Sequence, residues 1–376
     1  MLLETFSQGK CARRNQDNAG SHLPNEILSQ VLSDISSEDS GTLAAFCMVS
    51  KRFNSIGHTK LWRKVKLGPT STGAGNQDRN ADSMTRWNED QRKTIKHLSV
   101  IHHTNDWCKL SHTRHLDLPN IEILEIKMQD GFGNFHHVTE NSSNTLCPLM
   151  KQLRPKTMII RNATWLIVNL QCKGLAPRAW SEVETLIFVA PYVNTGFYER
   201  KYPYCHPTMP KLRRVFWIFD PTIEANIEDT EFRDSIQYHL LSVLTLRYPN
   251  IPITIVNVGP PNLYPVYSRF FGGRTFDGSE QIFRYWMDYF YQHEDDQPAG
   301  IEKKKQKLVR FISLNRFLEE ERWKEWFEDK EIRIWKNSLA IQENHYEKIQ
   351  SANLDRRRRP RLTLRRTHFA RYLSET

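Results

Sequence analysis

The segments LPNEILSQVLSDI (residues 23–35) and LAAFCMVSKRFNSIGHTKLWRKVKL (residues 43–67) decide the fold of the amino-terminal part of the chain. In the first segment, proline occupies the opening turn of a helix, where its missing N–H would have no partner anyway. The apolar residues after it recur at the spacing of a single helical face: Ile27, Leu28, Val31, Leu32 and Ile35. The segment therefore predicts an amphipathic helix.

The second segment predicts two more helices. We expect one of them to begin with Thr42 as its N-cap and to end at Gly57, and a shorter one to follow it. Their apolar residues are Leu43, Phe46, Val49, Phe53, Ile56, Leu61, Trp62 and Val65. Three helices this short have too little interior to cover all these side chains. We therefore expect an uncovered apolar stripe that a second polypeptide covers; three helices of a larger core are the alternative.

Together these helices closely resemble the F-box, a module that docks on Skp-type adaptor proteins. The resemblance rests on Leu23-Pro24, Glu26-Ile27-Leu28, Val31-Leu32, Leu43, Val49-Ser50-Lys51-Arg52-Phe53 and Leu61-Trp62-Arg63. The first connection is longer than is usual in the family, and Thr42 stands where the family has an acidic helix cap. The resemblance implies an adaptor-binding face made by Leu23, Pro24, Ile27, Leu28, Val31, Leu32, Leu43, Val49, Phe53 and Trp62.

A repeated phrase follows the F-box-like segment. It reads TIKHLSVIH (94–102), LPNIEILEIKM (118–128), WSEVETLIFVA (180–190) and MPKLRRVFWIFD (209–220), with weaker copies at 157–163 and 251–258. Alternating apolar residues predict short strands that begin near 98, 124, 158, 186, 215 and 253. The segments between the strands are long enough for crossover connections.

These repeats resemble the degenerate leucine-rich repeats that often follow an F-box, particularly in filamentous fungi. The expected fold combines α+β and α/β features: a three-helix F-box, then an irregular leucine-rich-repeat-like α/β solenoid with a helical C-terminal cap. An irregular α/β domain without true repeats is the alternative. We expect crossover or capping helices at 228–247, 278–296 and 315–330, and a closing strand at 307–314.

The predicted organisation has five parts. A disordered terminus (1–20) precedes the F-box (21–67), and a linker rich in Gly, Ser, Thr and Asn (68–92) comes next. The leucine-rich-repeat-like domain with its capping helices covers 93–335, and a basic C-terminal tail covers 336–376.

Composition narrows the class of protein. No stretch is long and apolar enough for a membrane span, no signal-peptide core is present, and the six cysteines form no C-x-x-C pair. We therefore expect an intracellular protein, in the cytoplasm, the nucleus or both, with no membrane association and no disulfide framework. The net charge of +10 is concentrated in residues 351–376, which hold eight arginines against two acidic residues.

Common phosphate-binding, nucleophile and zinc motifs are missing, so we expect no catalytic residue, no metal and no cofactor. The densest metal-like group has a spacing that matches no familiar zinc site: His102, His103, Cys108, His112 and His115. Surface histidines on a loop are the favoured interpretation. Two short basic runs are candidate binding sites for nuclear import receptors: Lys303, Lys304 and Lys305, and Arg356, Arg357, Arg358 and Arg359. A solubilising tail is the alternative.

The resemblance implies a non-catalytic substrate-recognition subunit of a Skp–cullin–F-box ubiquitin ligase. Such a protein binds a Skp-family adaptor, and through it a cullin, with its F-box, and holds an unknown protein substrate with its repeat domain, on the strand face or the adjoining loops. The alternatives are a scaffold that binds the adaptor outside any ligase, and a basic nuclear protein associated with nucleic acid; we do not expect nucleic acid as the main partner.

Overall fold

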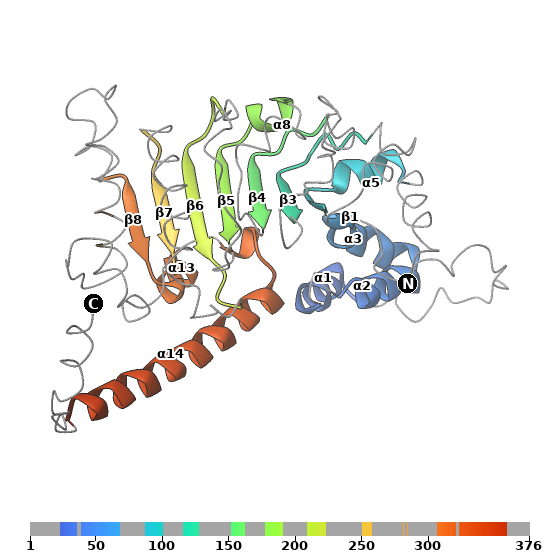
Figure 1. The fold of residues 1–376 in the computed structure, drawn as a ribbon. Coiled ribbons are helices and arrows are strands. Elements are labelled where there is room, and N and C mark those ends of the chain that lie inside the picture. Colours follow the sequence, from blue (N-terminus) through green and yellow to red (C-terminus); the bar gives the residue numbers. More distant parts are fainter. Residues whose placement is uncertain are drawn as a thin grey trace, which may run out of the picture. The chain divides into compact units, whose positions relative to one another are not determined.

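The computed structural model describes residues 23–35, 39–67, 87–100, 116–127, 152–161, 177–190, 209–222, 250–257, 281, 284, 307–320 and 323–358 (Figure 1). In these ranges, no helix has the length and apolar character that crossing a membrane requires. The chain divides into two compact units, residues 1–328 and residues 329–376.

Three helices open the described chain: α1 (Asn25–Asp34), α2 (Ser40–Val49) and α3 (Lys51–Trp62). Their shared interior consists of Leu28, Leu32, Leu43 and Phe46, against which Ile35, Cys47, Phe53, Ile56 and Leu61 pack. The helical spacing of these residues places them on the inward faces, so the first expectation from the sequence is confirmed for α1.

The boundaries of the next two helices differ from those we expected. The N-cap of α2 is Asp39, whose carboxylate accepts from the backbone N–H of Thr42 at 2.9 Å. Ser50 then ends α2 and caps α3, because its hydroxyl accepts from the N–H of Phe53. Gly57 therefore lies inside α3 instead of ending a helix.

Eight strands form one sheet in which each strand pairs in parallel with the next one along the chain. They are β1 (Lys64–Leu67), β2 (His97–Val100), β3 (Ile123–Lys127), β4 (Thr157–Arg161), β5 (Thr185–Ala190), β6 (Arg214–Phe219), β7 (Ile253–Val256) and β8 (Val309–Ile312). Seven of them lie where the repeated phrase and the closing strand were predicted. The exception is β1, where we had expected the end of the third helix.

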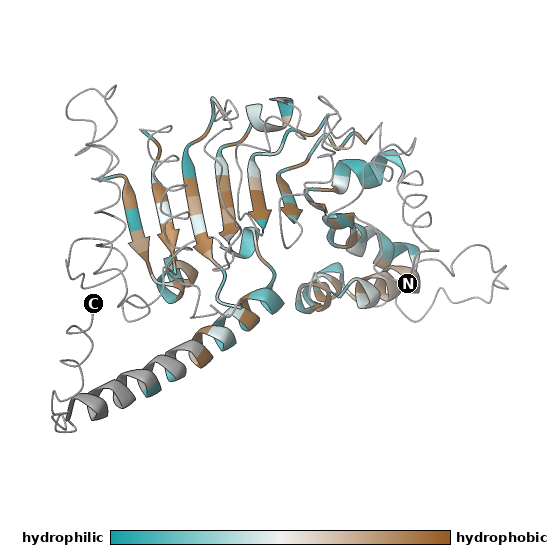
Figure 2. Cartoon of the chain, in the orientation of Figure 1, coloured by the Kyte–Doolittle hydropathy of each residue, from teal (hydrophilic) through white to brown (hydrophobic). Residues whose placement is uncertain are grey.

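The two faces of the sheet differ in chemistry. Alternation along each strand places Leu98, Leu124, Met158, Leu186 and Val215, all fully buried, on the first face. The second face is mixed: Lys64, Lys66, His97, Glu125 and Arg161 make it largely charged at β1 to β4, and apolar Ile187, Phe216 and Ile218 alternate there with Thr185 and Arg214 at β5 and β6. Figure 2 shows how strongly apolar the strands are.

Short helices and the C-terminal elements complete the fold. They are α5 (Glu89–Thr94), α8 (Pro177–Ser181), α13 (Leu314–Glu320), the 3-10 turn η4 (Trp323–Glu325) and α14 (Asp329–Arg358). A capping box made by Asn88 and Gln91 starts α5 near the end of the predicted linker. The predicted helix 228–247 lies outside the described residues, as does most of 278–296.

The C-terminal expectations need correction. The predicted helix 315–330 is divided, because α13 ends at Glu320 and η4 makes a separate turn. Residues 336–358, which we had assigned to a tail, belong to the 30-residue helix α14. Neither glycine nor proline interrupts α14 before Pro360, and helix-favouring Lys, Glu, Gln, Ala and Arg recur along it, which is consistent with its length.

Candidate functional site

An exposed apolar stripe runs along α1 and its entry. Leu23, Ile27 and Val31 are spaced four residues apart, so they lie on one side of the helix. They are 44%, 43% and 46% exposed, although all three are large hydrophobic residues. The turn between α1 and α2 lies partly outside the described residues, but the stripe itself is fully described.

A second exposed apolar pair ends α2. Met48 is 61% exposed and Val49 is 56% exposed. Val49 was among the predicted docking residues, whereas Met48 was missed because its position in the helix pattern gave no sign of its exposure. Five large hydrophobic side chains on this small helical domain therefore face outward.

The remaining predicted docking residues have different positions. Pro24 is exposed beside Leu23, and Phe53 and Trp62 are partly buried. Leu28, Leu32 and Leu43 are buried inside the three helices, at 1%, 8% and 1% exposure. These three leucines therefore support the stripe from within, and their contact with an adaptor stays a prediction.

Lys60 of α3 holds the end of α1 in place. Its ammonium group donates to the carbonyl oxygens of Leu32 and Ile35, both at 2.6 Å. Carbonyls at a helix C-terminus lack intrahelical partners, and a cation there also interacts favourably with the helix dipole. Burial lowers the pKa of Lys60, with Asp34 acting in the opposite direction. This contact fixes α1, and with it the exposed stripe, on α3.

α3 is tied to the sheet by its own continuation. Only Arg63 separates α3 from β1, and its carbonyl accepts from the N–H groups of Lys96 and His97, each at 3.0 Å. The ring of Trp62 meets that of Trp87 edge-on, with 6.3 Å between their centroids. The three helices are thus joined to the first pair of strands through backbone bonds and an aromatic contact.

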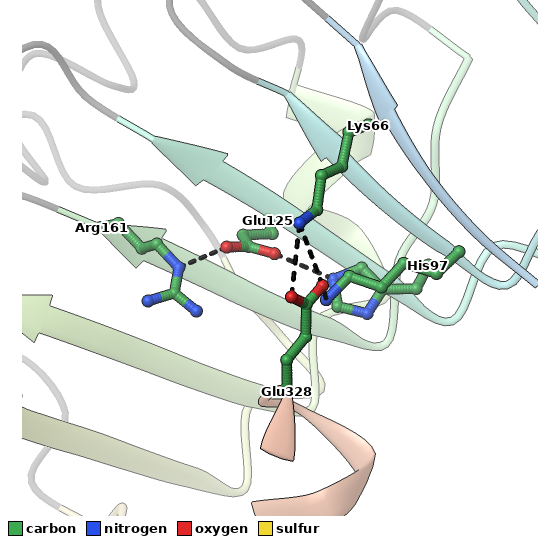
Figure 3. Close-up of polar contacts among 6 residues, drawn as sticks. Lys66, His97, Glu125, Arg161 and Glu328 are labelled. Carbon is green, nitrogen blue, oxygen red and sulfur yellow. Dashed lines mark hydrogen bonds and ion pairs between the residues drawn. The ribbon is translucent and has the colours of Figure 1, made fainter. Parts of the chain in front are cut away.

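A charged cluster occupies the second face of the sheet (Figure 3). His97 Nε2 lies 3.1 Å from Glu125 Oε2, and the other carboxylate oxygen of Glu125 accepts from Arg161 Nε. Register explains the grouping, because these residues lie on the same face of β2, β3 and β4. His97 and Glu125 are both buried.

Burial and neighbouring charges set the protonation of this cluster. Burial lowers the pKa of His97, reinforced by the cations Lys64 and Arg161 and opposed by Glu125. Burial alone would raise the pKa of Glu125, but the hydrogen bond to His97 and the charge of Arg161 outweigh it, so that pKa lies well below its usual value. The cluster therefore contains a neutral imidazole and an ionised carboxylate, with Nε2–H of His97 donating.

Residues 323–328, which we call the strap, lie against the same face. Trp326 packs on Phe216 of β6, with ring centroids 5.1 Å apart, and Phe327 lies under the guanidinium of Arg161 at 5.4 Å. Glu328 Oε1 pairs with Lys64 Nζ at 2.6 Å and Lys66 Nζ at 3.1 Å on β1. The sequence placed these residues in the predicted helix 315–330 and gave no sign that they cross the strands.

The other predicted sites lie largely outside the described residues. In the part of the chain that the structure describes, no three His, Cys, Asp or Glu side chains are arranged to hold a metal ion. The His/Cys group at 102–115 lies outside the described residues, as do Lys303, Lys304, Lys305 and Arg359. Arg356, Arg357 and Arg358 end α14.

Comparison with protein families agrees with the helical site. A family model described as F-box-like matches residues 21–67, the range that holds the three helices, the exposed stripe and β1. Comparisons with curated proteins and with solved structures gave no match. Residues 21–67 thus form an F-box-like domain, and domains of this kind typically bind Skp1-like adaptors, which suggests a role in adaptor binding of the Skp–cullin–F-box type.

Proposed function

We propose that this protein is a non-catalytic substrate-recognition subunit of a Skp–cullin–F-box ubiquitin ligase. One observation carries the proposal: the F-box-like domain leaves Leu23, Ile27 and Val31 exposed in a row on a helix that packs into the three-helix core through Leu28 and Leu32. Fully burying side chains of this kind contributes about 1.5–3 kcal/mol each. A stripe of three, with Met48 and Val49 on α2, supplies enough apolar area for a stable complex with an adaptor.

The sheet is the proposed target-binding domain. Its strands follow one another in chain order and all run parallel, which supports a leucine-rich-repeat-like solenoid that offers strand faces and loops to a partner. Such a subunit forms and breaks no bond itself. It raises the effective concentration of the target near the ubiquitin-loaded enzyme and orients it there. The setting is the cytoplasm, the nucleus or both.

Co-purification from cells tests the proposed function. A tagged chain is compared with the double variant Leu23→Ala, Pro24→Ala and with the control Gln30→Ala, an exposed polar position on α1. We expect the wild type and the control to retain the adaptor and a cullin, and the double variant to lose both. If the wild type retains the adaptor but no cullin, the result favours a scaffold outside any ligase. If the double variant still retains the adaptor, the result contradicts the proposal that this stripe docks the adaptor.

A further inference from the structure

The second face of the sheet is already occupied by a short stretch of the chain's own sequence. Three consecutive strap residues each meet a different strand: Trp326 meets β6, Phe327 meets β4 and Glu328 meets β1. Arg214 of β6 also lies over the ring of Trp326, with 5.2 Å from its Cζ to the ring centroid. The strap therefore crosses the strands with an aromatic–aromatic–acidic sequence.

Side chains, and not strand pairing, hold the strap in place. The N–H groups of Trp326 and Phe327 both donate to the carbonyl of Trp323, at 2.9 and 2.8 Å, so these bonds close a turn within the strap. The contacts to the sheet that the structure describes are a tilted ring–ring contact, cation–π contacts and ion pairs. A short peptide bound to a protein surface is recognised by the same kinds of contact.

The face beneath the strap combines buried apolar residues, such as Ile159, Ile187 and Phe216, with a group of charged ones. Lys64, Lys66, Arg161 and Arg214 line it, and the buried pair His97 and Glu125 lies among them. Buried ionic groups add little stability compared with well-packed apolar residues, and the first face shows that this sheet can build an apolar surface. Cations that lie over aromatic rings and beside a carboxylate suit a ligand that carries both aromatic rings and negative charge.

We propose that the strap is an intramolecular occupant of the target-binding face, and that a target protein displaces it with a segment bearing two aromatic residues followed by a carboxylate. This inference rests on the proposed function and specifies the chemistry of the substrate. Because Trp326 and Phe327 are buried, a competitor must supply equivalent apolar area. A segment with acidic residues alone would not displace the strap.

A labelled peptide with the chain's own sequence ERWKEWFEDK (residues 321–330) tests the proposal by fluorescence anisotropy with the full chain. The strap variant is Phe327→Ala, Glu328→Ala, and the matched control is Glu319→Ala, an exposed acidic position on α13. We expect the strap variant to bind the peptide about tenfold more tightly than wild type, because apparent affinity rises with the fraction of open face. Lys66 is an exposed lysine of the edge strand that pairs with Glu328. Adding Lys66→Glu to the strap variant should reverse its gain in affinity for the peptide, because the acidic residue of the peptide then loses this cation.

Three results would overturn the proposal: equal peptide binding by all chains, equally tight binding of a scrambled peptide, or loss of the folded state in the strap variant, checked by circular dichroism. The last result would show that the strap is a structural element that no target could displace. Adaptor co-purification is measured on the same variants. Retained adaptor with no peptide binding defeats this inference alone, whereas a wild-type chain that binds no adaptor defeats the proposed function.

Discussion

Among individual residues, adjacent positions on α1 have opposite roles. Ile27 is exposed and Leu28 is buried, although the sequence places both on one apolar face. Periodicity identifies the apolar side of a helix but does not show where the interior of the domain ends and a docking surface begins. The same limit explains why Leu32 and Leu43 were predicted as contacts and Met48 was not.

Replacing each of these neighbours should separate stability from binding. Leu28→Ala removes a fully buried side chain and should lower the free energy of unfolding of the F-box-like domain by about 2–5 kcal/mol. Ile27→Ala removes exposed surface and should change it by less than about 0.5 kcal/mol. Urea denaturation followed by circular dichroism measures both. Similar losses from the two variants would show that Ile27 is part of the interior.

The buried pair His97 and Glu125 makes stability depend on pH. The unfolded chain protonates His97 near its ordinary pKa of 6.5, whereas burial lowers that pKa in the fold. As pH falls below this value, the unfolded state binds more protons and the free energy of unfolding decreases, by up to about 1.4 kcal/mol per pH unit from this group. The lowered pKa of Glu125 adds a loss in the same direction once pH falls below its ordinary value.

Thermal melting between about pH 7.5 and about pH 5.5 measures this dependence. The variant His97→Gln keeps a hydrogen-bonding group but cannot become charged, so its melting temperature should fall less over this range than that of the wild type. His58→Gln on α3 controls for the loss of one histidine. Equal slopes for the wild type and His97→Gln would exclude His97 as the source of the pH dependence.

Among helices and strands, the close approach of α2 and α3 depends on a glycine. A Cβ atom at Gly57 would lie 2.7 Å from Cys47 Sγ and 3.0 Å from Phe46 Cδ1, both on α2. Gly57→Ala should therefore destabilise the three helices by about 1–3 kcal/mol, as other overpacked interiors are destabilised. At Gly41 the nearest atom would be 3.6 Å away, so Gly41→Ala should be neutral or stabilising. Chemical denaturation of both variants tests this, and equal effects would contradict the close contact.

The sequence predicted strands better than the segments around them. Six strands carry the repeated alternation of apolar residues, and β8 was predicted separately as a closing strand, so short-range pattern alone identified seven. Lys64–Leu67 lacks that phrase and follows a helix directly, so its pairing with β2, a contact distant in sequence, could not be predicted. The sequence did contain a signal for the boundary between α2 and α3 at Ser50, because serine is a good N-cap. The apolar pattern continues from Leu43 to Ile56, however, so a single helix was predicted there.

For the whole molecule, the F-box-like domain includes the first strand of the sheet, and only Arg63 separates its third helix from that strand. The charged cluster and the strap belong to the same compact unit as these helices. None of these long-range groupings has a sequence motif: Glu328 and Lys64 are far apart along the chain, and only the folded sheet brings them together. The sequence could therefore predict the F-box-like domain, but not the face that the strap occupies.

The decisive measurement is the dissociation constant between the purified full chain and a purified Skp-type adaptor, determined by isothermal titration calorimetry. Ile27→Asp places a charge in the exposed stripe, and Ser29→Asp places the same charge on the other side of α1. We predict that the wild type and Ser29→Asp bind alike and that Ile27→Asp binds about a hundredfold more weakly or not at all. A wild-type chain that fails to bind, or equal affinities for all three chains, would show that this stripe is not an adaptor-docking surface.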